Sequence, residues 1–379
     1  MDQRDLTKSK KRDASLPKGR QVDDTALAEV AQVLGTLPVR RDLLIEALHL
    51  IQDQYGYLSA AHIAALAEHF RLAQVEIYEV ASFYHHFDIV KEGEAPPAAV
   101  TIRVCDGLSC AMAGAESLIS DLTAQHNGAD IRIQRVPCIG RCDAAPTCQV
   151  GKRAIDSATS AKVDAVLDTS LDPVVPKYEG FDAYRQTGGY AVLSNLLSGK
   201  ITSDKILADM SHSGLRGLGG AGFPAGRKWG FARSYPGPRL MTVNGDEGEP
   251  GTFKDRYWLE RHPHRMLEGA QIAARVVGCE RIYIYIRDEY PAVLDILKAE
   301  IAALETSEFE VIPMELRRGA GAYICGEESA MIESIEGKRG LPRHRPPYIA
   351  EVGLFGRPTL NHNIETLLWI PQIIEQGAD

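Results

Sequence analysis

The turn GLRGLGGAGFPAGRKW at residues 214–229 and the turn NGDEGEPG at residues 244–251 lie on either side of a short apolar segment. Six glycines in the first turn remove side chains where a flat or phosphorylated ligand must approach the backbone. The segment between the turns, Arg239–Val243, has the composition of a buried parallel strand. Because ligands bind beyond the carboxyl ends of such strands, we expect the second turn to border a binding site.

Strand-like and helix-like segments alternate after the second turn. Further strands are expected at Arg281–Ile286 and Glu308–Met314, and helices at Met266–Val277 and Pro291–Leu304. This alternation predicts an α/β fold with a Rossmann-like parallel sheet. Residues 217–222 could be aligned with the dinucleotide fingerprint G-x-G-x-x-G. That fingerprint needs a strand directly before it, however, and none is predicted there.

Length, charge and cysteine content narrow the class of protein. The chain has 379 residues and is 45% hydrophobic, which predicts two or three domains. No apolar run approaches the roughly 18 residues of a membrane helix, and no signal segment is recognised, so a cytoplasmic protein without membrane insertion is expected. The formal net charge of -9 argues against nucleic acid as a partner. The seven cysteines are expected to be metal ligands and free thiols.

Four of these cysteines follow two predicted strands. Val100–Val104 and Ile131–Val136 read as strands with a helix between them at about residues 115–125, a thioredoxin-like alternation. The cysteines come in two pairs, Cys105 with Cys110 and Cys138 with Cys142. Two pairs of thiolates are what a 2Fe-2S cluster requires, because each iron takes two sulfurs. Zinc would also accept four cysteines, although its sites usually use a tighter C-x2-C spacing.

The residues before this unit have helical periodicity, with Ser59 as a plausible N-cap for one of the helices. His85 and His86 stand side by side near the end of this region and could be suggested as metal ligands. Adjacent residues on a helix point about 100° apart, so the two should not share one ion. We expect a surface or packed pair instead.

The glycine-rich motifs also carry a family resemblance. The two turns and a third motif downstream, GAGAYICGEES at residues 319–329, resemble the FMN- and NADH-binding subunit of respiratory complex I. They are similar also to the diaphorase subunits of NAD-reducing hydrogenases and of molybdenum- or tungsten-dependent formate dehydrogenases. The stretch CIGRCDAAP at residues 138–146 resembles the thioredoxin-like 2Fe-2S subunit that accompanies this flavoprotein. This resemblance favours the cluster over zinc, and Cys148 is then interpreted as a structural thiol.

Composition, periodicity and breaks in the pattern divide the chain into four regions, which the resemblance names. These are a disordered basic tail (1–23), a helical bundle (24–95), a thioredoxin-like 2Fe-2S domain (96–172) and an FMN- and NAD-binding flavoprotein domain (173–379), entered through a linker at Leu171–Pro176. The relatives continue with a ubiquitin-like domain and a helical region carrying a 4Fe-4S cluster. No matching cysteine run occurs here, so we expect the natural protein to be longer than this sequence.

The resemblance also implies the roles of individual residues. Expected at the flavin phosphate or incoming nucleotide are Gly217, Gly219, Gly220 and Lys228, and at the ring and ribityl chain Asn244, Asp246 and Glu247. The expected nucleotide slot has Phe223 and Phe231 as walls and Glu249 and Glu328 as hydrogen-bond acceptors. Tyr323, Gly326, Glu327 and Asn363 are carried over as further cofactor contacts, and Arg343, Arg345 and Tyr348 fit a loop over the nucleotide. Leu218 and His362 depart from the residues usual in the family.

The implied activity is a diaphorase reaction with FMN, NAD and a 2Fe-2S cluster as cofactors. The Gly217–Gly220 sequence GLGG and the four cysteines favour the beta subunit of an NAD-dependent formate dehydrogenase. The expected partner is then the catalytic alpha subunit, which carries molybdenum or tungsten and further iron-sulfur clusters. The alternatives are the diaphorase of a hydrogenase, a complex I module, a non-catalytic iron-sulfur scaffold and a zinc-stabilised interaction module.

Overall fold

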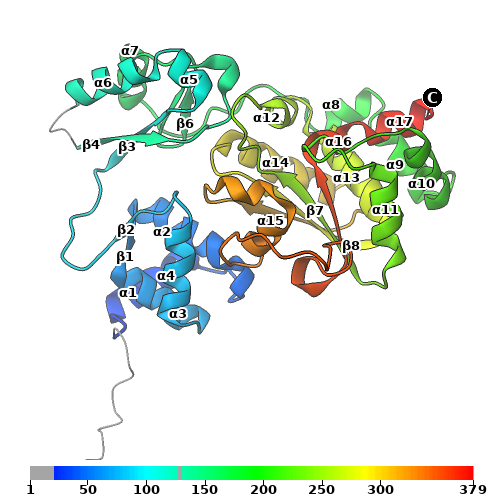
Figure 1. Cartoon of the computed structure of the whole chain (residues 1–379), viewed down its shortest axis with the longest axis horizontal. Helices are drawn as coiled ribbons and strands as arrows, with labels where there is room; N and C mark the ends of the chain where they lie inside the picture. The colour runs from blue at the N-terminus through cyan, green and yellow to red at the C-terminus, as the bar shows by residue number, and fades with distance from the viewer. Residues whose placement is uncertain (1–20, 127–129, 379) are drawn as a thin grey trace, which may run out of the picture.

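The computed structural model describes residues 21–126 and 130–378. Figure 1 shows a helical bundle, a smaller unit with its own sheet and a larger α/β unit, in the order of the chain. The tail expected at residues 1–23 falls almost entirely outside the described residues. In the part of the chain that is described, no helix is long and apolar enough to cross a membrane.

The bundle follows the helical periodicity of the sequence. Its elements are α1 (Asp24–Leu34), the 3-10 turn η1 (Arg41–Leu43), α2 (Leu44–Tyr55), β1 (Leu58–Ser59), α3 (Ala60–Phe70), α4 (Gln74–Phe83) and β2 (Ile89–Val90). Ser59 caps α3 as predicted, because its Oγ accepts the His62 N–H at 3.0 Å. The apolar faces of the helices meet in a core that includes Leu48, Ile51 and Leu66.

The second unit is built on a mixed sheet with the strand order β4-β3-β5-β6. Its elements are β3 (Val100–Cys105), α5 (Leu108–Met112), α6 (Ala115–Gln125), β4 (Ile131–Val136), η2 (Cys142–Ala144), β5 (Cys148–Val150), β6 (Arg153–Ile155) and α7 (Ser160–Leu167). β3 and β4 are parallel, whereas β5 is antiparallel to both β3 and β6. Both cysteine pairs begin at or just after a parallel strand, so the fold brings them to the same edge of the sheet.

The third unit is a four-stranded sheet, order β10-β7-β8-β9, in which every neighbouring pair is parallel. Four helices precede it: α8 (Phe181–Gln186), α9 (Ala191–Leu197), α10 (Ser203–His212) and α11 (Ala225–Ser234). The sheet and its crossovers comprise β7 (Arg239–Gly245), α12 (Lys254–Leu259), α13 (Pro263–Val277), β8 (Cys279–Ile286), α14 (Pro291–Glu305) and β9 (Met314–Arg318). The chain ends with η3 (Tyr323–Gly326), α15 (Glu328–Ile335), η4 (Leu354–Gly356), β10 (Thr359–Asn363), α16 (Ile364–Leu368) and α17 (Ile370–Gln376). The predicted Rossmann-like parallel sheet is confirmed.

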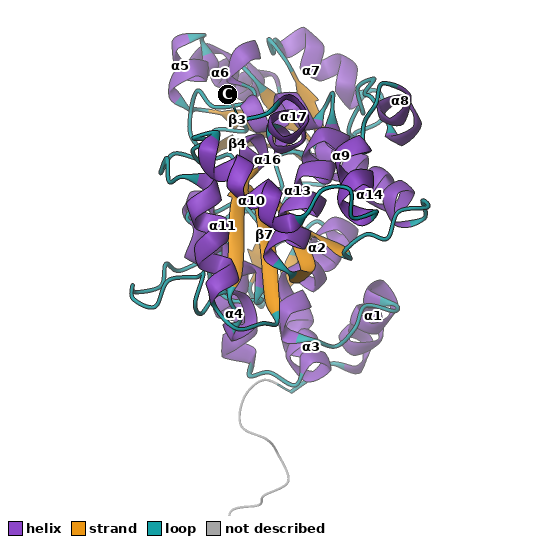
Figure 2. Ribbon diagram, turned by 90° about the vertical axis from the view of Figure 1, so that its right-hand side faces the viewer, coloured by secondary structure: helices purple, strands orange, loops and turns teal. Residues whose placement is uncertain are grey.

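The two faces of this sheet are covered by different parts of the chain. Ile282, Ile284 and Ile286 of β8 pack into a core with α13 and other helices of the same unit. Tyr283 and Tyr285 alternate with them and pack into the core of the N-terminal bundle. Figure 2 shows the strands enclosed between helical layers. The bundle and α15, which contributes Met331 and Ile332 to the same core, together form the second cover of the flavoprotein sheet. Both faces of β8 are apolar for this reason.

One predicted strand lies at the wrong position. The strand expected at Glu308–Met314 is β9, Met314–Arg318, and it pairs with Ile282–Ile286. The apolar residues Phe309, Val311 and Ile312 instead pack onto the helical core, and the Gln271 side chain bonds the backbone of Ile312. Apolar character alone could not separate a packed loop from a strand in so short a segment.

Candidate functional site

The four predicted cysteine ligands converge at one end of the small sheet. Cys138 Sγ lies 3.3 Å from Cys142 Sγ, and Cys105 and Cys110 pack in the same small cluster. All four are free thiols. Hydrogen bonding from Cys105 lowers the pKa of Cys110 to about 6 and that of Cys138 to about 5. Four converging thiols, two of them biased toward the thiolate, fit the ligand set of a 2Fe-2S cluster.

The remaining cysteines do not join this set. Cys148 lies fully buried on β5, as expected for a structural thiol, and burial raises its pKa to about 12. Cys279 and Cys325 are buried in the cores of the larger unit, where burial likewise raises the pKa of each to about 12. Protonated, enclosed thiols of this kind are packing residues.

Backbone N–H groups point at the cysteine sulfurs from two different units. The Gly140 N–H donates to Cys138 Sγ at 3.4 Å, within the cysteine loop itself. The Gly251 N–H, at the end of the second glycine turn, donates to Cys142 Sγ at 3.2 Å. Such hydrogen bonds help to set the reduction potential of a cluster. The acidic turn therefore touches the predicted cluster site directly.

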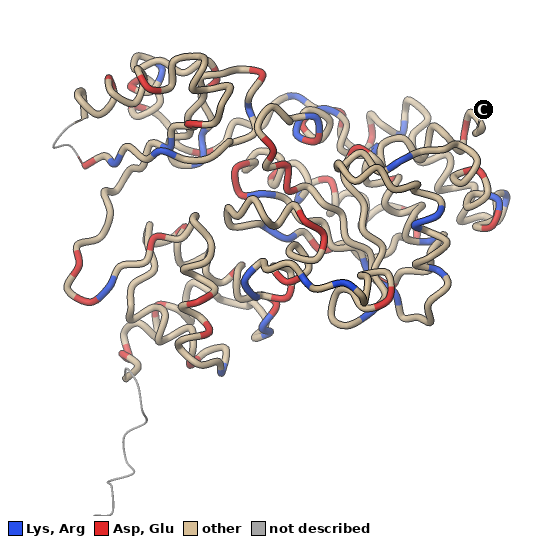
Figure 3. Tube along the Cα trace, in the orientation of Figure 1, with Lys and Arg blue, Asp and Glu red and all other residues tan. Residues whose placement is uncertain are grey.

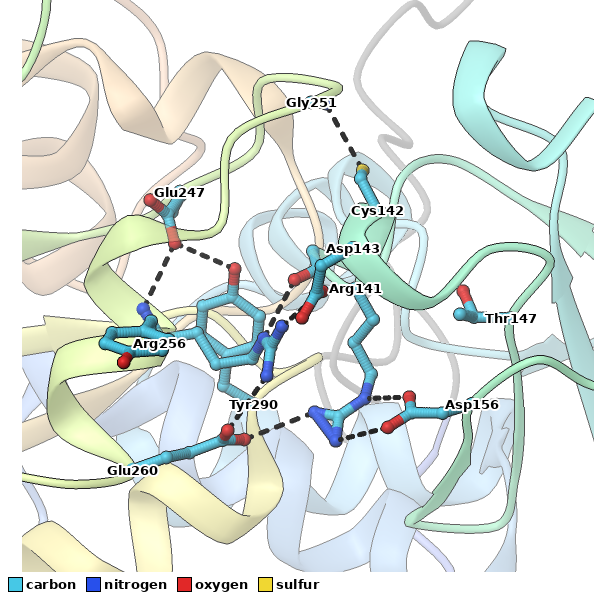
Figure 4. A network of polar contacts seen from close by, with 12 residues as sticks. Arg141, Cys142, Asp143, Thr147, Asp156, Glu247, Gly251, Arg256, Glu260 and Tyr290 are labelled. Carbon is cyan, nitrogen blue, oxygen red and sulfur yellow. Dashed lines mark hydrogen bonds and ion pairs between the residues drawn. The ribbon is translucent and has the colours of Figure 1, made fainter. Parts of the chain in front are cut away.

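An arginine from α12 joins the cysteine loop to the flavoprotein unit (Figure 4). Arg256 donates from Nε to the Gly140 carbonyl at 3.0 Å and from a terminal nitrogen to Asp143 at 2.6 Å. Its other terminal nitrogen donates to Glu260 at 2.8 Å. The Arg256 side chain is only 6% exposed, so this is a desolvated network. Charge-assisted bonds in such surroundings fix the loop firmly.

Arg287 and Tyr290, which follow β8, complete the contact. Arg287 donates to the Cys138 carbonyl at 2.6 Å and to the Glu247 carbonyl, and it pairs with Glu289 at 3.0 Å. Tyr290 lies so close to Gly140 that an added Cβ there would fall 2.1 Å from the phenol oxygen. Only glycine fits at residue 140, where φ is +73° as well.

Glu247 was expected to hydrogen-bond the flavin ring and ribityl hydroxyls, and its carboxylate also has partners within the protein. In the structure one carboxylate oxygen accepts the Asp255 N–H at 3.0 Å, and the other accepts the Arg256 N–H at 3.2 Å and the Tyr290 hydroxyl at 3.1 Å. The side chain therefore caps the start of α12. The backbone carbonyl of Glu247 accepts from Arg287 as well, so both the carboxylate and the carbonyl of Glu247 hold the turn against α12 and β8.

The first glycine turn closes on itself and on the asparagine turn near the C-terminus. The Gly217 N–H donates to the Phe223 carbonyl at 2.9 Å, and the Leu218 N–H donates to Thr366 Oγ1 at 2.9 Å. A Cβ added at Gly219 would meet Asn363 Cβ at 3.0 Å. The turn thus presents bare backbone at the carboxyl end of the sheet, which suits a phosphate.

The other motifs meet at the same place. Asn244 Nδ2 donates to the Gly326 carbonyl at 2.9 Å, joining the second turn to the third motif. Tyr323 donates its hydroxyl hydrogen to Glu249, and this exposed hydrogen bond also joins the third motif to the second turn. Segments separated by as many as 148 residues therefore form one site around the ends of β7 and β10.

The buried carboxylate of Asp246 has an unmet hydrogen-bonding need. Its Oδ2 has no hydrogen-bond partner among the described residues, and burial raises the pKa of the carboxyl to about 7. An orphaned buried acceptor at the end of a parallel strand is suited to receive a ligand hydroxyl. This observation fits the expected contact between Asp246 and the ribityl chain or ring of FMN.

Lys228 and Glu328 bring opposite charges to the site. The Lys228 ammonium lies 3.3 Å from Glu328 Oε2, and Arg345 lies 3.3 Å from the other Glu328 oxygen. Glu327 pairs with Arg345 and caps α15 by accepting the Ser329 N–H at 2.9 Å. Arg343, which was expected in a loop over the nucleotide, forms ion pairs with Glu333 and Glu336.

Exposed aromatic side chains flank these charges. Phe223 and Phe231 are 41% and 49% exposed, with ring centroids 6.2 Å apart, and Tyr323 is 66% exposed. The Arg227 guanidinium lies 5.7 Å from the Phe223 ring centroid and 5.9 Å from that of Phe231. Aromatic rings left open to solvent beside bare backbone form a surface on which a planar ligand can stack.

The two departures from the family pattern have different outcomes. His362 is buried and accepts the Trp229 indole N–H at 2.6 Å, and burial lowers its pKa to about 3. A neutral imidazole is thus a packing partner for Trp229. Leu218 contributes its backbone N–H to the closure of the first turn through Thr366, as described above.

Beside His362, Asn363 caps α16 by accepting the Glu365 N–H at 3.1 Å and donates to Asp255 at 2.6 Å.

Sequence reasoning did not identify the interface residues Arg256, Arg287 and Tyr290. Arg287 and Tyr290 belong to the segment RDEY at residues 287–290, directly after the buried strand β8. A charged segment at the carboxyl end of a parallel strand is a recognisable signal of a functional edge. No such signal distinguishes Arg256, whose role depends on the position of another domain.

Comparisons with known proteins agree with the two-part site. Residues 25–170 match the family model "Thioredoxin-like [2Fe-2S] ferredoxin", and residues 210–372 match "Nuo51 FMN-binding domain". The chain therefore combines a thioredoxin-like 2Fe-2S unit with a Nuo51 FMN-binding domain, which confirms the predicted fold class and the FMN and 2Fe-2S cofactors.

Related proteins and solved structures extend this likeness. One chain of the NADH-quinone oxidoreductase of Aquifex aeolicus is 46% identical over 53% of this chain and 49% of its own length. The alpha subunit of the NAD-reducing hydrogenase HoxS of Cupriavidus necator is 30% identical over 93% of this chain and 65% of its own length. A crystal structure of an NAD+-reducing [NiFe]-hydrogenase matches with a TM-score of 0.77 and 35% identity, covering 90% of this chain and 62% of that chain. The chain thus spans about half to two thirds of the length of these relatives.

Proposed function

We propose that the chain is a diaphorase module, in which a hydride is exchanged between NAD(H) and FMN and single electrons pass to or from the 2Fe-2S cluster. The observation that carries this proposal is the contact of the acidic turn with the cluster site, where the Gly251 N–H lies 3.2 Å from Cys142 Sγ. FMN, when bound, supplies both the hydride exchange and the release of electrons one at a time. The protein supplies position, charge and shielding.

Each group at the site has a distinct task under this proposal. The bare backbone at Gly217, Gly219 and Gly220 receives the phosphate, with Lys228 as the cation beside it. Asn244 and Asp246 bind the ribityl hydroxyls or the ring. Phe223, Phe231 and Tyr323 receive the planar groups of NAD(H), and Gly326, Glu327 and Asn363 maintain the shape of the cradle. Glu249 and Glu328 accept hydrogen bonds from the dinucleotide and limit how tightly the oxidised product is held.

The finer proposal concerns the complete enzyme. We propose a cytoplasmic NAD-dependent formate dehydrogenase, in which this chain is the beta subunit and the partner is a molybdenum- or tungsten-containing alpha subunit with further iron-sulfur clusters. The GLGG sequence at residues 217–220, together with the four intact cysteines, favours this assignment.

A second candidate is the diaphorase subunit of an NAD-reducing hydrogenase. The specific observation in its favour is that the HoxS alpha subunit aligns with 93% of this chain, across both domains. The solved hydrogenase structures cover 90% of the chain with TM-scores of 0.77 and 0.78. The two candidates share the module and differ only in the catalytic partner.

A visible absorption spectrum of the anaerobically purified protein, before and after NADH, tests the module. We expect flavin and iron-sulfur bands that both bleach on addition of NADH. Bleaching of flavin alone would show that the cluster lies off the main electron path. A protein without flavin bands would support the non-catalytic scaffold instead, and zinc in place of iron would support the interaction module.

Purification of the native complex through a tag on this chain distinguishes the two enzymes. We expect the captured complex to reduce NAD with formate and to contain molybdenum or tungsten. Reduction of NAD with hydrogen, with nickel in the complex and no response to formate, would replace the formate assignment with the hydrogenase.

A further inference from the structure

Two histidines and an aspartate meet where the helical bundle packs on the flavoprotein sheet. His49 lies on α2, His86 follows α4, and Asp288 follows β8. One donor atom from each of the three residues lies within 4.8 Å of the donor atoms of the other two. The two imidazole ring centroids are 4.9 Å apart. This group lies outside the flavin and cysteine sites and has no role in the proposed diaphorase reaction.

The hydrogen bonds of His49 define where its proton and its lone pair are. Nε2 lies 2.9 Å from the Gly319 carbonyl oxygen, which can only accept, so Nε2 carries the hydrogen of the neutral ring. Nδ1 then carries the lone pair, and it is buried without a hydrogen-bond partner among the described residues. His49 as a whole is only 2% exposed, so bulk solvent does not satisfy this nitrogen.

His86 also has one ring nitrogen that carries a hydrogen and one with a free lone pair, but here Nδ1 carries the hydrogen. Nδ1 lies 2.7 Å from Asp288 Oδ2, whose other oxygen accepts from Arg318 Nε at 2.5 Å. Asp288 is therefore held as a carboxylate that accepts the His86 Nδ1 hydrogen. Nε2 of His86 is left with its lone pair, and it too is buried and has no partner in the described part of the chain.

Two imidazoles, each with one N–H held by a carbonyl or a carboxylate and a free lone pair on the other nitrogen, have the surroundings of metal ligands. Protein ligands of this type almost always donate their second ring N–H to such an outer partner, which fixes the tautomer and the ring orientation. We propose that His49 Nδ1 and His86 Nε2 bind a divalent transition-metal ion that prefers imidazole, with zinc as its representative, and that Asp288 is the orienting carboxylate.

Both free nitrogens are enclosed by protein, and the proposed site borders a cavity. His86 and Asp288 line a cavity of about 570 Å³ that lies between the bundle, the thioredoxin-like unit and the flavoprotein sheet. Arg318 and Lys152 bring positive charge to this cavity, balanced by Asp53, which pairs with both, and by Asp288. Arg103, Arg132 and Lys298 line the same cavity, as do the acidic residues Asp88, Asp172 and Asp295, so the ion would lie beside mixed charges rather than an apolar wall.

The proposed ion would fix the third glycine motif. Three histidines contact three consecutive backbone carbonyls of this motif. The His49 ring contacts the carbonyl of Gly319, the backbone N–H of His86 donates to that of Ala320 at 3.2 Å, and the His85 ring contacts that of Gly321. These residues lead into Tyr323 of the flavin site. His85 and His86 lie beyond the end of α4, so the expected helical spacing does not apply to them. Sequence analysis favoured a surface or packed pair, whereas under this proposal His86 shares an ion with His49 of α2.

Metal analysis of the full chain with its iron-sulfur cluster tests the proposal. Zinc and iron are counted in the same sample by mass spectrometry after growth with added zinc, for wild type, His49→Gln, His86→Gln and the control His69→Gln on α3. We expect close to one zinc per chain in wild type and in His69→Gln, and a loss of at least about fivefold in the other two variants. Zinc that persists in both variants, or that rises only as iron falls, would place it at the cysteines and overturn the proposal.

Thermal unfolding provides a second readout if the glutamine variants fold poorly. The wild-type protein, stripped of loosely bound metal with a mild chelator that leaves the cluster iron in place, should regain thermal stability when zinc is added back. Asp288→Asn should weaken the zinc affinity roughly 10- to 100-fold. Unchanged unfolding with zinc, and no zinc in the untreated wild type, would mean that a water molecule joins the two lone pairs and would overturn the proposal. Neither measurement uses NADH, so failure here is independent of the proposed function.

Discussion

The two halves of the redox site are built in opposite ways. Around the cysteines the contacts between domains are buried and charged: Arg287 is 4% exposed and Arg256 is 5% exposed. Around the first glycine turn the surface is open, with Phe223, Phe231 and Tyr323 each more than 40% exposed. Figure 3 shows acidic and basic residues spread along the whole trace. One half is rigid and the other is accessible.

Electron transfer and nucleotide exchange explain the difference. A cluster that exchanges electrons with a flavin must stay at a fixed distance, so its loop is held by desolvated arginines. A dinucleotide must enter and leave in each turnover, so its surface has few bonds that would need to break. Four substitutions test this contrast, beginning with the largest expected effect.

Arg287→Met should destabilise the rigid half most. The substitution removes the bonds to the carbonyls of Cys138 and Glu247 and leaves the Glu289 carboxylate buried without its partner. Breaking a buried pair in this way costs about 3 to 5 kcal/mol. Chemical denaturation measures this loss, and electron paramagnetic resonance after NADH addition measures whether the cluster is still reduced.

The matched control is Arg135→Met in the thioredoxin-like domain. Arg135 pairs with Glu116 at the surface, where both side chains are about half exposed or more. Such an exposed pair contributes little to stability, because solvent screens the two charges. Equal losses for the two variants would contradict the claim that the buried interface, rather than arginine in general, holds the cluster loop.

Asp246→Asn tests whether the buried carboxyl group of Asp246, which lies between the two halves, makes the stability of the protein depend on pH. Burial raises the pKa of Asp246 to about 7 from an ordinary value of 3.8. The stabilising contribution of the neutral carboxyl is thus fully present below about pH 3.8 and is lost as pH rises through about 7. The variant cannot ionise at this position. As the pH rises from 5 to 8, its free energy of unfolding should therefore gain on the order of 2 to 4 kcal/mol relative to that of the wild type. Urea unfolding of the FMN-free proteins at both pH values measures this. A difference between the proteins that does not change with pH would show that Asp246 stays ionised.

Phe223→Ala should affect binding and leave stability nearly unchanged. The ring is 41% exposed, so little packing is lost in the free protein. Removing a stacking surface should raise KM for NADH about tenfold, because about 1 to 1.5 kcal/mol of binding free energy is lost. Steady-state kinetics with an artificial acceptor measures KM. Tyr78→Ala, at a similarly exposed aromatic in the bundle, should leave KM unchanged. A large fall in thermal stability of Phe223→Ala would contradict the open character of this half.

Glu249→Gln should have the smallest effect. The charge near the dinucleotide is expected to weaken binding of the product NAD, so the neutral side chain should lower the inhibition constant of NAD severalfold, by less than about 1 kcal/mol. The Tyr323 hydroxyl can still donate to the amide oxygen of glutamine. An unchanged constant in product-inhibition kinetics would remove the proposed role of Glu249.

Local patterns predicted much of this molecule. The alternation of apolar segments indicated the parallel sheet, and the cysteine spacing indicated four ligands beside two strands. The shifted strand Met314–Arg318 shows where pattern reasoning fails, because short apolar segments pack as well in loops as in strands. The capping of α12 by the Glu247 carboxylate is a second contact that no pattern along the chain indicated, because Glu247 precedes the helix by several residues.

The sequence by itself determined the two cofactor modules, because glycine turns and paired cysteines express requirements that are local to each ligand. Only the tertiary structure decided how the modules meet. Arg256 reaches the carbonyl of Gly140 across 116 positions, and His49 reaches that of Gly319 across 270. Such pairings follow from the packing of whole domains, and no periodicity or spacing along the chain encodes the distance between two of its surfaces.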